Sequence, residues 1–207
     1  LGVRYCYFIQ TAVQGMPVIV TRAGWSGEVG YEIYLLESDQ GSALWESVME
    51  AGKPYNLAPT GPSDIRRIEA GILNYGADIT LADNPYEVGL DWMVDLDQDA
   101  EFIGKSALAR TAREGPRRKL VGVEIEGERI EFNMTKWPVS AAGAPVGRIT
   151  SAIYSPSLKK NIGYAMLPVE HAELGTVLSV SVPDSGERRA TVVPRPFVDP
   201  AKEIPKD

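Results

Sequence analysis

Hydrophobic and polar positions alternate along the first part of the chain in a way that predicts a pair of strands. Residues 18–21 read Val-Ile-Val-Thr, a short β-branched run that is typical of a buried strand. In the next strand, Tyr31 and Ile33 are expected on one face and Glu32 on the other. Because the loop between them, residues 23–30, carries three glycines, we predict a hairpin-like pair.

Three helices are expected in the same part of the chain. The first follows Ser38 or Asp39, either of which suits an N-cap, and it stops near Gly52. The second opens at residues 61–64, where a proline and an aspartate suit the first turn. The third spans residues 105–113 and ends before a Gly-Pro pair.

Beyond residue 116 the pattern changes to short alternating strands separated by turn residues. The expected strands lie at residues 119–125, 146–154, 162–166, 177–182 and 190–193. This spacing is typical of a small all-β barrel or sandwich. We therefore predict an α+β chain with one domain at residues 1–116, which includes a linker helix, and a β-domain at residues 117–207.

Composition narrows the class of protein. The chain has 207 residues, of which 44% are hydrophobic, and a formal net charge of -7, as in an ordinary soluble globular protein. An acidic balance argues against nucleic-acid binding, because neutralising phosphates requires a basic face. No stretch approaches the roughly 20 apolar residues that span a bilayer, and no signal peptide is visible. We expect neither a nucleic acid nor a membrane as partner.

Cysteine and histidine are too rare to build a metal site or a Ser-His-Asp triad. The chain has one of each, Cys6 and His171. Cys6 lies in an apolar run and is expected to be a small buried side chain, whereas His171 is expected on the surface. Because no internal disulfide is possible, we expect a reducing, cytoplasmic environment. Because ligand residues are so few, we expect no bound metal.

Glu32 is the first candidate for ligand binding. A carboxylate accepts two parallel N–H donors, such as those of an arginine or of the aminopyrimidine edge of a pterin or purine. If Tyr31 and Ile33 face a core, Glu32 faces a groove or solvent. The residue type alone favours an ordinary solvent-facing strand residue.

The helix that opens at residues 61–64 supplies the second candidate. Arg67, Gly71 and Tyr75 are spaced by four and would share one helical face, where the small glycine leaves room for a flat ligand. The planar, permanently charged fork of Arg67 suits an anionic ligand. The alternative is an ordinary surface helix with exposed ion pairs, such as Arg67 with Asp64, which stabilise little.

The ordered motifs of the chain resemble those of the aminomethyltransferase family, the T-protein of the glycine cleavage system. The matching segments are residues 25–32, 67–71, 75–79, 85–92, 102–105, 146–151, 155–158, 161–165 and 196–198. Their order over nearly the whole chain makes the resemblance more specific than any one motif. It implies a partial folate-binding domain, built as an antiparallel sheet with helices, followed by a small C-terminal β-barrel.

The resemblance also implies a tetrahydrofolate site. It carries the pterin-holding glutamate over to Glu32 and the arginine of the Arg-x-Glu-Ala-Gly helix to Arg67. It places an aromatic ring near the folate at Trp25, where the family usually has tyrosine, and Tyr75 is a weaker fourth candidate. The family tyrosine after the Pro-Phe-Val segment has no equivalent, since Lys202 stands there.

The expected reaction is transfer of a one-carbon unit to folate N5, in which such enzymes mainly position and electrostatically tune the reactants. The family's catalytic carboxylate precedes the matched motifs. The chain starts at Leu1 with residues that look like the middle of a sheet, so we expect an N-terminal portion to be missing. No catalytic residue is therefore assigned, and the chain alone is expected to have little transferase activity.

Three functions remain open. The first is aminomethyl transfer, with the lipoyl carrier protein (H-protein) as partner. The second is folate-dependent demethylation of a small methylated substrate, because Trp25 and residues 74–80 resemble dimethylsulfoniopropionate demethylases. The third is a folate-binding or interaction module without catalysis.

Overall fold

The structure is a computed structural model that describes residues 2–206. It divides into two compact units, the first formed by Leu1–Arg66 with Ala201–Asp207 and the second by Arg67–Pro200. The predicted division between residues 116 and 117 concerns the sequence pattern, and it stays a prediction.

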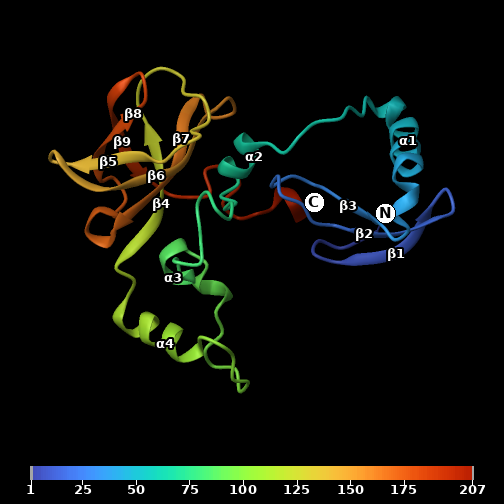
Figure 1. The fold of residues 1–207 in the computed structure, drawn as a ribbon, viewed down its shortest axis with the longest axis horizontal. Coiled ribbons are helices and arrows are strands. Elements are labelled where there is room, and N and C mark those ends of the chain that lie inside the picture. Colours follow the sequence, from blue (N-terminus) through green and yellow to red (C-terminus); the bar gives the residue numbers. More distant parts are fainter. Residues whose placement is uncertain (1, 207) are drawn as a thin grey trace. The chain divides into compact units, whose positions relative to one another are not determined.

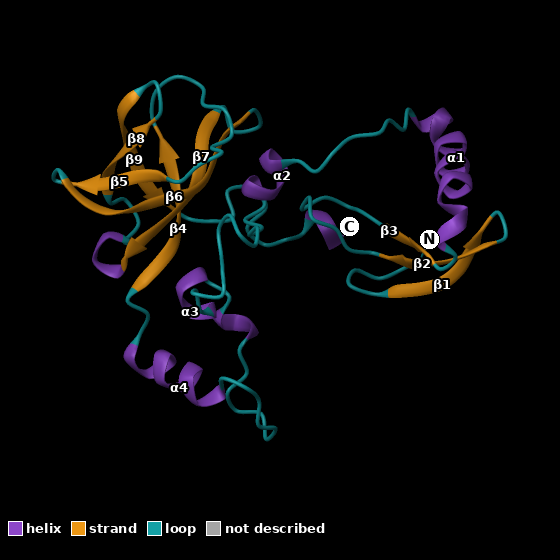
Figure 2. Ribbon diagram, in the orientation of Figure 1, coloured by secondary structure: helices purple, strands orange, loops and turns teal. Residues whose placement is uncertain are grey.

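The first unit holds a three-stranded antiparallel sheet in the order β1 (Phe8–Val13), β2 (Met16–Thr21) and β3 (Glu32–Leu35). Helix α1 (Gly41–Gly52) follows β3 (Figures 1 and 2). The predicted pairing of the strands that flank the glycine-rich loop is confirmed, whereas β1 was not predicted as a strand of its own. The predicted first helix is confirmed, and Gly52 is its last residue.

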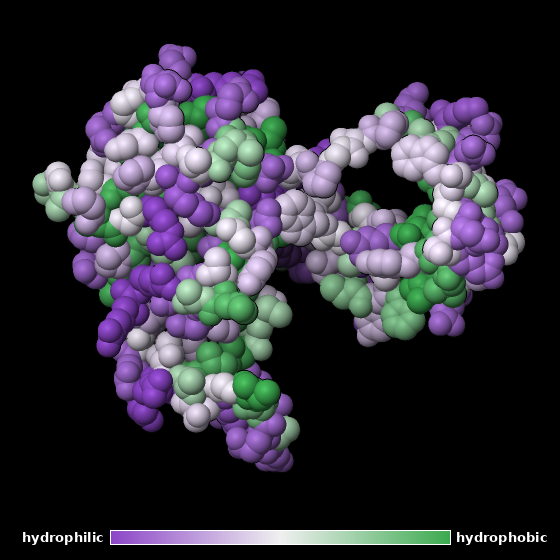
Figure 3. All heavy atoms as spheres, viewed as in Figure 1, coloured by the Kyte–Doolittle hydropathy of each residue, from purple (hydrophilic) through white to green (hydrophobic). Residues whose placement is uncertain are grey.

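Burial in this sheet is concentrated on the central strand. Met16, Val18 and Val20 alternate along β2 and are 6%, 0% and 3% exposed, as expected for one covered face of a strand. On β3, Ile33 is 40% exposed, so the premise that it faces a core does not hold within this unit. Figure 3 shows hydrophobic side chains at the surface of the same unit.

The helices that lead into the barrel are short. They are α2 (Asp64–Glu69), α3 (Pro85–Val88) and α4 (Lys105–Glu114). Helix α3 begins with a capping box, in which the Asn84 side chain accepts from the Glu87 backbone and the Glu87 side chain accepts from the Asn84 backbone. The second helix, predicted to open at residues 61–64, begins at Asp64 and leaves the proline outside it, and the predicted third helix is confirmed.

Six antiparallel strands close into a barrel in the order β4-β7-β6-β5-β8-β9. The strands are β4 (Arg118–Ile125), β5 (Trp137–Ala141), β6 (Ala144–Ser155), β7 (Lys160–Pro168), β8 (Val177–Val182) and β9 (Gly186–Val193). Of the two predicted architectures, barrel and sandwich, the barrel is confirmed, and every strand predicted beyond residue 116 belongs to it. Strand β5 was not predicted. The fold class is α+β, a small antiparallel sheet with helices followed by a β-barrel.

Alternation along β4 separates two hydrophobic clusters of the second unit. Val123 and Ile125 point into the barrel core with Ile149. Leu120 belongs to a second cluster, where it packs with Tyr164 of β7 and Ile68 of α2. Helix α2 is thus held against the outer wall of the barrel.

Two expectations about particular residues are corrected. Helix α2 ends at Glu69 and Gly71 has a φ of +72°, so Gly71 and Tyr75 do not share a helical face with Arg67. Cys6 is exposed and not buried, because it lies in the turn before β1 with a φ of +63°.

We predict that Ile149→Ala destabilises the barrel by about 2–5 kcal/mol, because Ile149 is fully buried and the truncation leaves a cavity. The matched control is Ile103→Ala, since Ile103 is 104% exposed, and it should change stability by less than about 0.5 kcal/mol. Urea denaturation followed by circular dichroism measures both. Equal midpoints for the two variants would contradict the assigned core.

Candidate functional site

Glu32 opens β3 in the first unit, opposite Thr21 of β2. Its Oε2 atom accepts hydrogen bonds from the Thr21 hydroxyl at 3.2 Å and from the Tyr34 hydroxyl at 2.7 Å. The bond to Glu32, followed by the negative charge of that carboxylate, raises the pKa of Tyr34. Both of these hydrogen bonds end on Oε2, and the side chain is exposed, so Oε1 can accept further donors.

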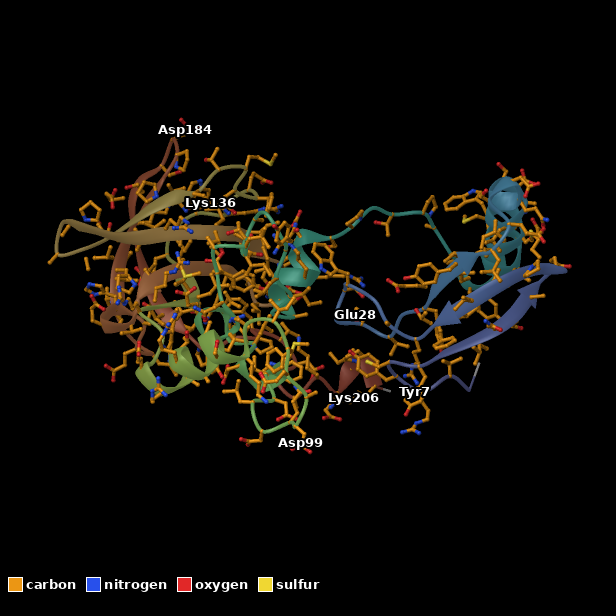
Figure 4. The ribbon with its side chains drawn as sticks, turned by 60° about the horizontal axis from the view of Figure 1, so that its bottom comes forward. Tyr7, Glu28, Asp99, Lys136, Asp184 and Lys206 are labelled. Carbon is orange, nitrogen blue, oxygen red and sulfur yellow. The ribbon has the colours of Figure 1, made fainter. Side chains whose placement is uncertain are left out.

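The glycine-rich loop between β2 and β3 carries Trp25, which is 40% exposed. Glu28, labelled in Figure 4, lies in the same loop, and its backbone N–H donates to the Ser26 hydroxyl at 3.3 Å. Both Trp25 and Glu32 therefore belong to the first unit. The other two predicted site residues, Arg67 and Tyr75, belong to the second.

Arg67 lies at the centre of a buried polar cluster. Its side chain is 0% exposed, and Nη1 donates to Asp78 Oδ2 at 2.9 Å. Nη2 donates to the Ser151 hydroxyl of β6 at 2.9 Å. The guanidinium carbon lies 5.8 Å from the ring centroid of Phe132. The alternative of an exposed surface pair is therefore wrong, because Arg67 is buried.

Asp78 is 3% exposed, and its carboxylate accepts two hydrogen bonds on each oxygen. Oδ2 accepts from Arg67 and from the backbone N–H of Asn74, both at 2.9 Å. Oδ1 accepts from the hydroxyls of Thr150 at 2.8 Å and Ser151 at 2.6 Å. A carboxylate has about four lone-pair positions, so this one is saturated.

Tyr75 lies in the loop of residues 74–79 and is 65% exposed. Backbone hydrogen bonds close the loop, from Asp78 N to Asn74 O at 2.8 Å and from Gly76 N to Ile79 O at 2.8 Å. The Lys136 ammonium, on the barrel in Figure 4, donates to the Ala77 carbonyl. Burial lowers the pKa of Lys136, and the nearby Asp78 charge opposes that shift.

Tyr164 of β7 joins the end of helix α2 to the barrel. Its hydroxyl lies within hydrogen-bond distance of the carbonyl oxygens of Ile68 at 3.0 Å and of Arg67 at 3.3 Å. Burial, followed by the charge of Asp78, raises the pKa of Tyr164. The hydroxyl therefore stays protonated and donates to carbonyls at the end of the short helix, which also accept from the backbone N–H groups of Gly71 and Ile72.

Comparison with known families places these features. The model of the GCVT N-terminal domain matches residues 2–98, and that of the glycine cleavage T-protein C-terminal barrel domain matches residues 118–199. The chain belongs to the glycine cleavage T-protein family. The predicted resemblance is thus confirmed, and the six-stranded barrel is the C-terminal barrel domain of this family.

The curated relatives include an aminomethyltransferase and a demethylase. The aminomethyltransferase of Synechococcus sp. (strain CC9902) is 41% identical over 189 residues, which cover 89% of this chain and 50% of the relative. Dimethylsulfoniopropionate demethylase DmdA of Ruegeria pomeroyi is 38% identical over 190 residues, which cover 92% of this chain and 51% of the relative. The chain spans about half the length of the curated relatives it matches.

A solved structure shows the same fold. The glycine cleavage system aminomethyltransferase T from Bartonella henselae matches with a TM-score of 0.82 at 24% identity. The match covers 95% of this chain and 53% of that chain. The fold of the matched part of this chain is therefore the fold of a solved structure.

The buried partners of Arg67 lie in two of the segments that resemble the family, but the sequence assigned them no role. Asp78 lies in the matching segment of residues 75–79, as the last residue of a Tyr-Gly-x-Asp motif. Thr150 and Ser151 end the matching segment of residues 146–151, which reads Val-Gly-Arg-Ile-Thr-Ser. The signal available was the presence of polar residues in otherwise apolar stretches of a T-protein family sequence. Thr150 and Ser151 lie 72 and 73 residues from Asp78 in sequence, so local patterns could not predict that they contact it.

Other features of the described residues are less informative. A groove of about 410 Å³ on the barrel is lined by Phe132, Trp137, Arg188 and neighbouring residues. Within residues 2–206, no cluster of three or more His, Cys, Asp or Glu side chains is arranged to hold a metal ion. Over the same residues, every helix is too short or too polar to cross a membrane.

We predict that Asp78→Asn destabilises the second unit by about 3–5 kcal/mol, because it leaves the buried Arg67 charge without its counter-ion. The control is Glu124→Gln, which removes the exposed pair with Lys160 and should cost less than about 1 kcal/mol. Urea denaturation of both variants provides the comparison. A loss for Asp78→Asn as small as that of the control would contradict a buried, paired Arg67.

Proposed function

We propose that this chain binds tetrahydrofolate and takes part in folate-dependent one-carbon transfer of the aminomethyltransferase type. The observation that supports the proposal is the succession of the two T-protein family domains along the chain. Similarity at about 40% identity to aminomethyltransferases, over about 90% of this chain, supports the same reading. Transfer of an aminomethyl unit, and not of a methyl group, is the version that we favour.

Glu32 is the proposed pterin-binding group. A pterin presents two parallel N–H donors at its aminopyrimidine edge, and the exposed Glu32 carboxylate keeps acceptor capacity on Oε1. Trp25 and Tyr75 are proposed to contact the rings of the folate, since each offers a partly exposed aromatic face. These three side chains fit the chemistry of the ligand.

Arg67 is proposed as a tetrahydrofolate-site residue on grounds of resemblance alone. Its guanidinium is buried and donates hydrogen bonds to Asp78 and Ser151, so its charge acts on these protein groups and not directly on a ligand. The proposal for Arg67 is therefore separable from that for the exposed residues. When bound, tetrahydrofolate supplies the N5 atom that accepts the one-carbon unit, while the side chains hold and orient it.

The donor of the one-carbon unit defines the main alternative. The aminomethyltransferase reading names the lipoyl-bound aminomethyl group of an H-protein as donor. The demethylase reading names a small methylated substrate, and the similarity to DmdA is the specific observation that favours it. A third possibility is a folate-binding module without catalysis.

We predict that the chain binds tetrahydrofolate and that Glu32→Ala weakens binding by about tenfold or more. The reason is that a hydrogen-bonded charged group contributes about 1.5–3 kcal/mol. Glu28→Ala is the control, because Glu28 is an exposed carboxylate of the neighbouring loop. Isothermal titration calorimetry measures all three proteins. Absence of binding heat for the unmodified chain would sink the proposed function.

We further predict that the isolated chain turns over little or no substrate. The carboxylate that the family uses has no counterpart among the matched motifs, and Asp78 is saturated by its four hydrogen bonds. Turnover is measured with an aminomethyl-loaded lipoyl carrier and with dimethylsulfoniopropionate, beside a full-length relative. A rate comparable to that of the relative would refute the prediction, and the preferred donor would separate the two transfer reactions.

A further inference from the structure

The polar cluster around Arg67 joins three segments that lie far apart in sequence. Arg67 comes from α2, Asp78 from the loop of residues 74–79, and Ser151 from barrel strand β6. The Ser151 hydroxyl accepts from Arg67 and donates to Asp78, so it bridges the two charged groups. Removing this hydroxyl would abolish both hydrogen bonds while leaving the ion pair of Arg67 and Asp78 in place.

Burial decides between two roles for Arg67. A residue that contacts a ligand directly presents polar atoms at a surface, whereas the Arg67 side chain is 0% exposed. Desolvating a guanidinium is costly unless its donors find partners, and here Nη1 donates to Asp78 and Nη2 donates to Ser151. A ligand that took these donors would leave Asp78 as an uncompensated buried charge.

The loop of residues 74–79 is anchored by hydrogen bonds to the buried cluster and to Lys136, and it exposes Tyr75. Asp78 accepts from the backbone N–H of Asn74, so both ends of the loop are tied to the same carboxylate. Lys136 holds the carbonyl of Ala77. Tyr75 is the large side chain that this loop exposes, at 65% of its surface.

We infer that strand β6 of the barrel positions the exposed Tyr75 ring, acting through Ser151, Asp78 and Arg67. Arg67 is then a positioning residue and Tyr75 the group that meets a flat ring of the ligand. A rigid aromatic face binds with less loss of conformational entropy than a mobile one. That the flat ring belongs to tetrahydrofolate rests on the proposed function.

The decisive variant is Ser151→Ala, examined first without ligand. We expect hydrogen–deuterium exchange of the backbone N–H groups of residues 76–79 to accelerate about tenfold, because the loop loses part of its anchor. Thr150→Val, which removes the other hydroxyl on Asp78 Oδ1, should act in the same direction. Unchanged exchange in both variants overturns the inference.

The matched control is Ser155→Ala. Ser155 is also 0% exposed and also lies on β6, but its hydroxyl donates to Glu69 and not to Asp78. It should leave exchange in residues 76–79 within about twofold of the unmodified protein. Equal acceleration by Ser151→Ala and Ser155→Ala would show general loosening of the barrel, and would overturn the inference.

The second readout is calorimetric affinity for tetrahydrofolate. Ser151→Ala should weaken binding about three- to tenfold in the unmodified background and by less than about twofold in a Tyr75→Ala background. An equal loss in both backgrounds overturns the link to Tyr75. Failure of the unmodified chain to bind overturns the proposed function alone, since the exchange experiment decides the positioning of the loop without ligand.

Discussion

The buried pair of Arg67 and Asp78 is the interaction on which the arrangement of the second unit depends. Two charges removed from water are tolerated only when geometry and further hydrogen bonds satisfy them. Here the carboxylate accepts four hydrogen bonds, two of them from hydroxyls of strand β6. The pair therefore fixes α2, the loop of residues 74–79 and the barrel wall in one arrangement. Any other arrangement would leave a buried charge without its counter-ion.

Helix α2 is too short to be stable by itself, since isolated helices need about 12–15 residues even with good propensity. It has six residues, and its end is satisfied from outside. The Tyr164 hydroxyl contacts its last carbonyls, and the backbone N–H groups of Phe197 and Val198 both donate to Glu69 O at 2.9 Å. The helix is thus a product of tertiary contacts with the barrel and with the segment that follows β9.

The same dependence explains what the sequence could and could not predict. Strands with clear alternation, such as Val121, Val123 and Ile125 in β4, were predictable because one face is buried in the barrel. Strand β5 was missed, since Trp137-Pro138-Val139-Ser140-Ala141 contains a proline and is short. The end of α2 was missed because the spacing by four continues past Gly71, where a positive φ breaks the helix.

The candidate site was predictable only in part, for a related reason. Local spacing shows which side chains could share a face, but it does not show depth. The contacts of Asp78 with Thr150 and Ser151 cross 72 and 73 residues, and no pattern within α2 reports them. Exposure separates the predicted residues into two kinds, with Glu32 and Tyr75 at the surface and Arg67 beneath it.

A family motif is therefore compatible with two physical causes, contact with a ligand and contact within the fold. The Arg-x-Glu-Ala-Gly motif and the Val-Gly-Arg-Ile-Thr-Ser motif meet through the hydrogen bond of Arg67 with Ser151. In the first motif, Gly71 is required by its positive φ and by the Pro196 ring, whose Cγ would lie 3.0 Å from an added Cβ. Both motifs thus have a structural reason that needs no ligand. A functional role for a motif residue has to be argued from what its side chain can reach, and by that measure the exposed Tyr75, and not the buried Arg67, is the side chain that a ligand could contact.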